Sequence, residues 1–262
     1  MRITTLAVLA ALFSNGAAMA ASACPAHYQN GAQPEFTNQS LGNRTRDLCN
    51  TEFVVMHSGL SRTPLWSAEH LTRERVLQAR KLSRENVFHP DERLHARERS
   101  ELADYHGSGL DRGHTTPSGD ASTMAAQNET FALSNMVPQD PKSNRGVWEH
   151  LEENTRNLAL KHGDIYVITG PLFISQKLRQ LNERVLVPSH LFKVIYDQKA
   201  ATAAAYLAPN DASGQSQVIS VAELNRMAGI NFLPGVADAI LNKAAELPAE
   251  SESPSAKRHR RH

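Results

Sequence analysis

Residues 108–116 read SGLDRGHTT and set an acid, a guanidinium, a flexible residue and an imidazole side by side, as Asp111, Arg112, Gly113 and His114. A neutral imidazole accepts a proton near physiological pH, and a guanidinium binds oxyanions such as phosphate. A histidine considered alone is more often an ordinary polar residue than a base. Whether His114 has a catalytic role therefore depends on which other side chains the fold places beside it.

The segment that follows supplies a helix with two polar residues on one side. Residues 144–162, NRGVWEHLEENTRNLALKH, carry apolar residues at roughly helical spacing and end before a glycine. Asn144, Trp148, Leu151 and Glu152 are spaced i, i+4, i+7 and i+8, which places them on one side of a regular helix. Trp148 and Leu151 would anchor that side, so Asn144 and Glu152 would flank a common cleft.

A strand with His114, a returning strand over 131–137 (FALSNMV) and this helix would form a compact strand–strand–helix unit. Amide and carboxylate oxygens are hard ligands that suit Mg²⁺ rather than zinc. Neutral His114 could then take a proton from water while the metal and Arg112 hold charge on a phosphate. In other interpretations Arg112 only pairs with a nearby acid, and Glu152 is an ordinary solvated helix residue.

The ordered motifs resemble the DNA/RNA non-specific endonuclease family, which includes the Serratia-type secreted nucleases and mitochondrial endonuclease G. DRGH is followed by LSNMVPQ, NRGVWEHLE and ITGPLF, and the similarity extends over most of residues 53–210. The resemblance implies the ββα-metal (His-Me finger) nuclease fold. The order of strands and helices along the chain independently favours the α+β class, with a central, mostly antiparallel sheet flanked by helices.

The resemblance also implies a role for each matching residue. His114 would be the general base that activates water, and Asn144 the direct protein ligand of Mg²⁺, with Mn²⁺ as an alternative metal. Glu152 would orient metal-bound waters, and Arg112 would bind phosphate. Asn135, in LSNMVPQ, would position the metal site or the histidine.

The implied reaction is hydrolysis of phosphodiester bonds in DNA and RNA, leaving 5′-phosphate ends. Arg62, in SRTPLW, is a further candidate phosphate contact, although some relatives have a second arginine where this chain has Pro64. Homodimers are common in the family, which raises the expectation of a homodimer here. A competing hypothesis is a catalytically weak nucleic-acid-binding protein on the same scaffold, and a third is a toxin restrained by an immunity partner.

The start of the chain carries features of export. Residues 1–20 have a basic start, a short apolar run and a small-residue cleavage pattern, which predict a signal peptide and a periplasmic or secreted protein. That run is too short for a membrane anchor, and no other stretch is long and apolar enough to span a membrane. In an exported chain Cys24 and Cys49 are expected to form a disulfide, the alternative being two free thiols.

The predicted organisation has four parts. Residues 1–20 are the signal peptide, 21–50 a disulfide-tied N-terminal lead-in, 51–247 the endonuclease domain, and 248–262 a disordered basic tail. Within the domain we expect strands over 53–59, 64–72, 164–173, 184–197 and 201–210, and helices over 122–129, 221–228 and 236–246.

Charge gives a weaker indication of partners. The formal net charge is +1, which by itself predicts none. Residues 71–100 are locally basic, and that pattern fits a polyanion-binding surface and a solvated, salt-bridged surface equally well.

Overall fold

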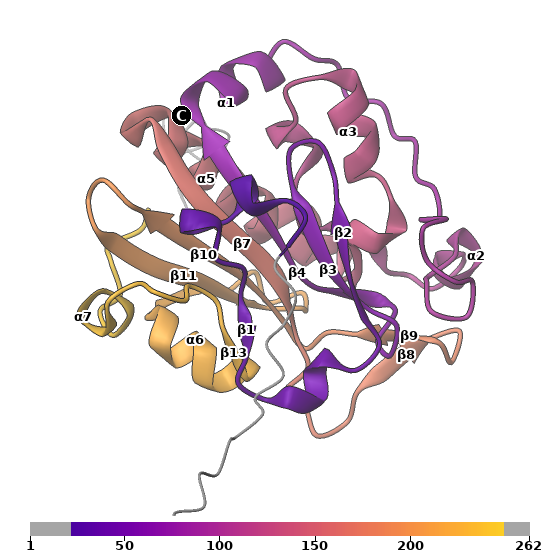
Figure 1. The fold of residues 1–262 in the computed structure, drawn as a ribbon. Helices are drawn as coiled ribbons and strands as arrows, with labels where there is room; N and C mark the ends of the chain where they lie inside the picture. The colour runs from indigo at the N-terminus through magenta and orange to yellow at the C-terminus, as the bar shows by residue number, and fades with distance from the viewer. Residues whose placement is uncertain (1–21, 249–262) are drawn as a thin grey trace, which may run out of the picture.

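The computed structural model describes residues 22–248 and shows a seven-stranded antiparallel sheet with helices on both faces (Figure 1). In spatial order the sheet contains β12 (Gln217–Ile219), β11 (Thr202–Pro209), β10 (His190–Asp197), β7 (Asp164–Leu172), β4 (Thr63–Thr72), β3 (Val54–Ser58) and β2 (Thr45–Cys49). The predicted α+β class with a central, mostly antiparallel sheet is confirmed. The signal peptide predicted over 1–20, and the predicted tail beyond residue 248, lie outside the described residues.

Three two-stranded pairs and a set of short helices complete the fold. The pairs are β1 (Glu35–Phe36) with β13 (Ile230–Asn231), β5 (Asp111–His114) with β6 (Met136–Gln139), and β8 (Arg179–Leu181) with β9 (Val185–Val187). The helices are α1 (Arg73–Ala79), α2 (Leu102–Tyr105), α3 (Met124–Thr130), α4 (Pro141–Ser143), α5 (Glu149–His162), α6 (Val221–Ala228) and α7 (Asp238–Leu241). A π-helical turn, η6 (Asn144–Trp148), joins α4 to α5, and 3₁₀ turns occupy Pro25–His27, Gln29–Gly31, Gln39–Gly42, Ser118–Asp120 and Leu133–Asn135.

The two faces of the sheet pack against different parts of the chain. Alternate residues of a strand point to opposite faces, so Val167 of β7 packs with Trp148 and Leu151, whereas Ile168 packs with the group around α6. Helices α6 and α7 lie together with the β1–β13 pair in the lower left of Figure 1. The face toward Trp148 is the one that supports the strand–strand–helix unit.

Two predicted strands have different boundaries in the structure. The segment predicted over 184–197 forms two strands, because β9 pairs with β8 whereas β10 belongs to the main sheet between β7 and β11. The strand predicted over 131–137 is wrong in extent: a 3₁₀ turn covers Leu133–Asn135, and β6 begins only at Met136. Pro138 lies inside β6, which is possible because this strand belongs to an isolated pair with an unpaired outer edge.

The three helices predicted over 122–129, 221–228 and 236–246 agree with the structure to different degrees. The helix predicted over 221–228 is confirmed as α6, which ends at Gly229 with φ +68°. The helix predicted over 122–129 begins two residues later, after the N-cap Thr123. The one predicted over 236–246 is reduced to a single turn, α7.

Of the segment expected as a lead-in, residues 21–50, the described part from residue 22 onward is built into the fold. Its strand β2 is an edge strand of the main sheet, and β1 pairs with β13 near the other end of the chain. Tyr28 and Phe36 are buried in the core. The predicted disulfide is confirmed, with the Cα atoms of Cys24 and Cys49 5.8 Å apart.

Removal of this disulfide by a Cys24→Ser/Cys49→Ser double substitution is expected to lower the free energy of unfolding by about 3 kcal/mol. The bridge joins residues 25 positions apart, and without it the unfolded chain gains the entropy of an open loop. Urea denaturation of both proteins measures the difference. The double variant should not respond to added reductant, and equal stability of the two proteins would contradict the prediction.

Across residues 22–248, no helix has the length and apolar character needed to cross a membrane.

Candidate active site

Strand β5, α2, the η6–α5 segment, the loop after α1 and the turn at Ser118–Asp120 line a cleft of about 1030 Å³. Four of the residues predicted from the sequence line it together: His114, Arg112, Asn144 and Glu152. Asn135 and Arg62 are not among its lining residues.

The strand–strand–helix unit is present and holds the cleft's polar groups. His114 on β5 pairs with Met136 on β6 in an antiparallel ladder. After β6, the Asp140 carboxylate accepts from the backbone N–H groups of Lys142 (2.8 Å) and Ser143 (3.2 Å) and so starts the helix.

The helix predicted as regular from 144 to 162 contains a π turn at its start. Gly146, with φ −121° and ψ −106°, interrupts the helical geometry between Asn144 and the first turn of α5. π turns inside α-helices are frequent at functional sites. Asn144 and Glu152 still line the same cleft on either side of this irregularity.

His114 is held between aromatic rings with one nitrogen enclosed. Its ring centroid lies 5.0 Å from that of Phe131 and 5.9 Å from that of Phe88, and the residue is 8% exposed. Nε2 is buried and finds no hydrogen-bond partner within residues 22–248, and the residue lines the cleft. Burial, helped by the positive charge of Arg84, lowers the pKa of His114 to about 3. The ring is therefore neutral at neutral pH.

Asn135 fixes the chain immediately after the histidine. Its Oδ1 accepts from the Thr115 hydroxyl (2.6 Å) and from the backbone N–H of Thr116 (3.0 Å). Its Nδ2 donates to the carbonyls of Thr116 (2.9 Å) and Thr130 (2.8 Å). The side chain is fully buried and its amide is used by backbone groups, so its geometry is that of a residue that positions His114.

Asp111 orients the carboxamide of Asn144. The Asn144 Nδ2 donates to the Asp111 Oδ2 at 2.9 Å, and Arg145 donates to both carboxylate oxygens at 2.8 and 2.6 Å. Partial burial opposes ionisation, but the hydrogen bonds from Arg145 and Asn144 hold the pKa of Asp111 below its ordinary value. Because Nδ2 is committed to Asp111, the Asn144 Oδ1 is left free to accept or to ligate.

Glu152 carries a carboxylate for which the described residues provide no hydrogen bond or ion pair. Burial raises the pKa of Glu152 to about 7, against the opposing effect of cations that include Lys193 and Arg156. Lys193 projects from β10 beneath the helix, is fully buried, and donates from Nζ to the Thr169 hydroxyl at 2.7 Å. A cation bound in the cleft would favour the ionised form of Glu152.

These two groups fit a hard divalent metal. Within residues 22–248 the Asn144 Oδ1 and the Glu152 carboxylate are oxygen donors without a hydrogen-bond or ion-pair partner, and oxygen donors are what Mg²⁺ takes. Residues 22–248 contain no group of three or more His, Cys, Asp or Glu side chains that could hold a metal. A cation here would therefore keep most of its ligands as water, as Mg²⁺ does.

Two arginines face the cleft without a carboxylate partner among residues 22–248. The Arg112 guanidinium lies 4.1 Å from the Phe88 ring centroid, and the Arg84 guanidinium lies 5.5 Å from that of Phe131. Arg84 also donates to the Asn86 Oδ1 at 3.0 Å. Guanidinium groups stacked on rings and free of acids are available to a phosphate.

Sequence reasoning missed Arg84, Arg145 and Arg156 as cleft residues. Arg156 follows Glu152 by four positions on α5, so helical spacing alone places both on one side. Its Nη1 pairs with the Asp120 carboxylate at 3.0 Å. Arg84 belongs to the basic stretch 71–100, but nothing in that pattern distinguishes it from the other arginines of the stretch. The basic stretch 71–100 contains residues of both predicted kinds. Arg84 lines the cleft, where it could bind a polyanion, whereas Arg75 forms a 2.7 Å ion pair with Glu69.

Arg62 lies elsewhere. It occupies the turn between β3 and β4 with φ +57°, and its Nε donates to the carbonyl of Arg97 at 2.9 Å. The tight turn directs this side chain away from the cleft that holds His114.

Gly113 leaves room for Gln139 on the neighbouring strand. A Cβ atom at position 113 would lie 2.0 Å from the Gln139 Oε1 and 2.8 Å from its Cβ. Gln139 is fully buried, and neither atom of its amide finds a partner within residues 22–248. The glycine of the DRGH motif is therefore required by packing rather than by its backbone angles.

Comparison with known proteins gives consistent matches. Residues 32–239 match the family described as DNA/RNA non-specific endonuclease. The sequence is 36% identical to mitochondrial nuclease EXOG of Danio rerio over 209 residues, covering 71% of this chain and 60% of that protein. It is 39% identical to nuclease C1 of Cunninghamella echinulata var. echinulata, covering 64% and 73%, and 32% identical to human mitochondrial endonuclease G, covering 75% and 71%.

The fold has a solved counterpart. A crystal structure of the EndoG/EndoGI complex matches with a TM-score of 0.66 and 29% sequence identity, covering 76% of this chain and 89% of that chain.

Proposed function

Because this chain belongs to the DNA/RNA non-specific endonuclease family, we propose that it is a Mg²⁺-dependent endonuclease that hydrolyses phosphodiester bonds of DNA and RNA and leaves 5′-phosphate ends. The observation that carries the proposal is the placement of His114 and Asn144 in one cleft. His114 lines that cleft, and the amide oxygen of Asn144 has no hydrogen-bond partner among residues 22–248.

The chemistry assigned to this chain begins at His114. In the tautomer that carries its proton on Nε2, the Nδ1 lone pair accepts a proton from a water in the cleft. The water oxygen attacks phosphorus as the bond from phosphorus to the 3′-oxygen breaks. The 3′-oxygen takes a proton from a second water and leaves as a hydroxyl, and the phosphate stays on the 5′-oxygen of the other product. Asn144 and Glu152 would hold the metal, which when bound neutralises negative charge on the phosphate.

Arg112 and Arg84 are assigned to the phosphate itself. Both are cleft cations with no acid partner among residues 22–248, so a phosphate oxygen can take their hydrogen bonds. Contacts to phosphates are the same for every base and carry no sequence information directly. This explains low base selectivity and the acceptance of both DNA and RNA.

We place the protein in the periplasm or outside the cell. The support is the signal-like sequence of residues 1–20 together with the Cys24–Cys49 disulfide, because disulfides persist in oxidising compartments. Residues 1–20 lie outside the described part of the chain, so the test is the N-terminal sequence of the exported protein. An unprocessed protein that stays in the cytoplasm would refute this placement.

Incubation of the purified protein with plasmid DNA or with RNA is expected to degrade both in Mg²⁺ and neither in EDTA. Removal of the metal leaves the phosphate charge uncompensated, and re-addition of Mg²⁺ should restore cleavage. Gel electrophoresis measures the products, and end-labelling identifies the 5′-phosphate. Binding without cutting in Mg²⁺ would instead support the alternative, a catalytically weak nucleic-acid-binding protein on this scaffold.

A further inference from the structure

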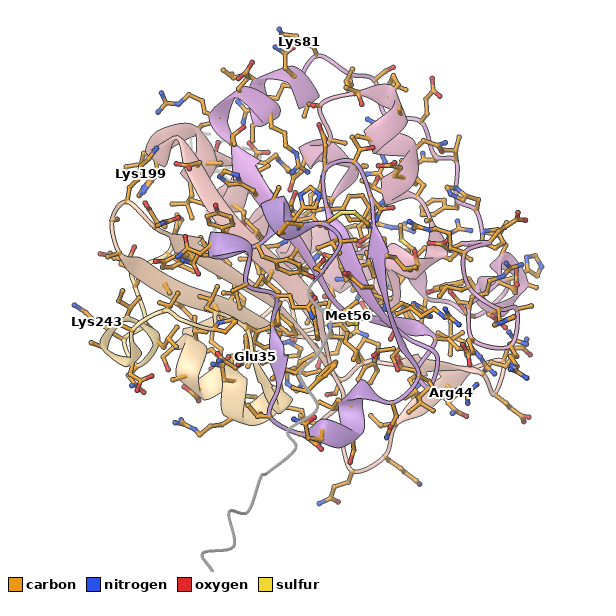
Figure 2. The ribbon with its side chains drawn as sticks, viewed as in Figure 1. Glu35, Arg44, Met56, Lys81, Lys199 and Lys243 are labelled. Atoms are coloured by element: carbon orange, nitrogen blue, oxygen red, sulfur yellow. A yellow bond between two sulfur atoms is a disulfide. The ribbon has the colours of Figure 1, made fainter. Side chains whose placement is uncertain are left out.

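Five arginines gather outside the cleft, where β2, the β3–β4 turn, the loop before α2 and the β8–β9 hairpin meet. We call this group the arginine patch: Arg44, Arg46, Arg62, Arg97 and Arg184. Arg62 interacts electrostatically with Arg184 and Arg44, and Arg44, Arg46 and Arg97 all act on Glu98. Figure 2 shows Arg44 on the side of the molecule where β8 and β9 lie.

The patch has more positive than negative charge. Two carboxylates contact it, Glu98 at 2.8 Å from Arg44 and Asp104 at 3.2 Å from Arg184. Arg46 and Arg97 are exposed, and within residues 22–248 their side chains make no hydrogen bond or salt bridge. Five guanidinium groups beside two carboxylates form a positive surface that attracts a polyanion.

The patch is held in a fixed arrangement by the backbone that it surrounds. The Arg62 Nε donates to the carbonyl of Arg97 at 2.9 Å. The Arg184 Nη2 donates to the carbonyls of Ala96 and Arg99, each at 3.3 Å. Two of the five guanidinium groups are thus positioned before any ligand arrives, which lowers the entropy lost on binding.

The patch and the cleft lie on opposite sides of one short helix. Leu102, Tyr105 and His106, in or next to α2, line the cleft. Asp104 of the same helix contacts Arg184 and accepts from the Asn182 amide at 3.1 Å. A helix with its side chains is about 10–12 Å across. The patch therefore begins about one helix width from the cleft.

A nucleic-acid duplex carries about one negative charge per 1.7 Å of its axis. A duplex seated in the cleft and continuing past α2 would place several phosphates over the patch. We propose that the arginine patch is an accessory nucleic-acid site that holds the phosphate backbone of a long substrate on one side of the bond to be cut. This inference rests on the proposed nuclease function and adds a preference for substrate length without a preference for sequence.

The test is the double variant Arg46→Gln/Arg97→Gln, whose side chains are exposed and make no hydrogen bond with the described residues. Binding to a duplex of about 30 base pairs is measured by fluorescence anisotropy between 0.05 and 0.5 M salt, in a His114→Ala background that prevents cleavage. Loss of one to two phosphate contacts should make the slope of log Kd against log salt shallower by about 0.9 to 1.8. At 0.1 M salt the Kd should rise roughly tenfold.

The matched control is Arg226→Gln/Lys243→Gln, which removes the same charge from the α6–α7 side of the molecule, where Figure 2 places Lys243. With His114 intact, the patch variant should hydrolyse bis(4-nitrophenyl) phosphate at the wild-type rate, because this small diester cannot reach beyond α2. An unchanged slope of log Kd against log salt in the patch variant, or an equal change in the control variant, would overturn the inference. The proposed nuclease function would still stand if the wild-type protein cleaved DNA. Absence of wild-type cleavage would refute the proposed function itself.

Discussion

Replacement of His114 by alanine is expected to lower the rate of DNA hydrolysis by about 10²–10⁴-fold, the range typical for loss of a general base. The ring is neutral at neutral pH, because burial and the charge of Arg84 lower the pKa of His114. Because Nε2 is buried, we assign the Nδ1 lone pair as the proton acceptor of this cleft residue. Alanine removes that acceptor but leaves Arg112, Arg84 and the metal-binding groups in place. Single-turnover cleavage of a labelled duplex in saturating Mg²⁺ measures the change in the chemical step.

The control for this variant is His106→Ala. His106 also lines the cleft but is exposed and lies at the end of α2, so its loss should change the rate by only a few-fold. Duplex affinity of the His114→Ala protein should remain close to that of the wild type, since phosphate contacts supply the binding energy. Near-normal cleavage by His114→Ala, or a larger loss for His106→Ala, would reverse the assignment of the base.

Replacement of Asn144 by alanine is expected to weaken metal binding by at least 10–100-fold, since loss of groups that only support metal ligands already has an effect of that size. The change removes the one uncommitted amide oxygen that Asp111 holds in orientation at the helix start. Two measurements separate binding from rate. Isothermal titration with Mn²⁺ reports the metal affinity of the protein alone, and cleavage over a range of Mg²⁺ concentrations reports the functional requirement.

Asn157→Ala is the matched control for Asn144→Ala. Asn157 lies on α5 outside the cleft, where its side chain accepts only a weak 3.4 Å hydrogen bond from Arg80. This variant should bind Mn²⁺ and require Mg²⁺ as the wild type does. If Asn144→Ala kept the wild-type affinity for Mn²⁺, the metal would have to be held by other groups, and the proposed site would be wrong.

The parts of the fold that the sequence predicted best are those with strong local patterns. Helix α6 has an N-cap at Ser220 and a glycine at its end, and both are visible in the sequence. The edge strand Thr45–Cys49 was missed because most of its side chains are exposed and polar, so it has no apolar pattern. The apolar side chains of residues 131–137 predict a strand, but a 3₁₀ turn also directs such side chains into the core.

The cleft residues that the sequence predicts are likewise those that lie close together along the chain. His114 and Arg112 share one strand, and Asn144 and Glu152 share one helix, so sequence spacing alone brings each pair together. Arg84 reaches the cleft from a loop about thirty residues before the motif, and only the folded chain reveals it. The SRTPLW segment was placed near the phosphate by resemblance, whereas the backbone of its turn directs Arg62 toward the loop that precedes α2.

The contact between Gly113 and Gln139 determines how this site can vary during evolution or engineering. Any side chain at 113 enters the volume that the glutamine already fills, so a replacement there requires Gln139 or its strand to shift. A shorter residue at 139 would remove the contact with Oε1, and the 2.8 Å contact with the Cβ of residue 139 would remain. Positions 113 and 139 must therefore change together. A library that randomises only the DRGH glycine would, after selection for folded and active protein, yield almost only glycine.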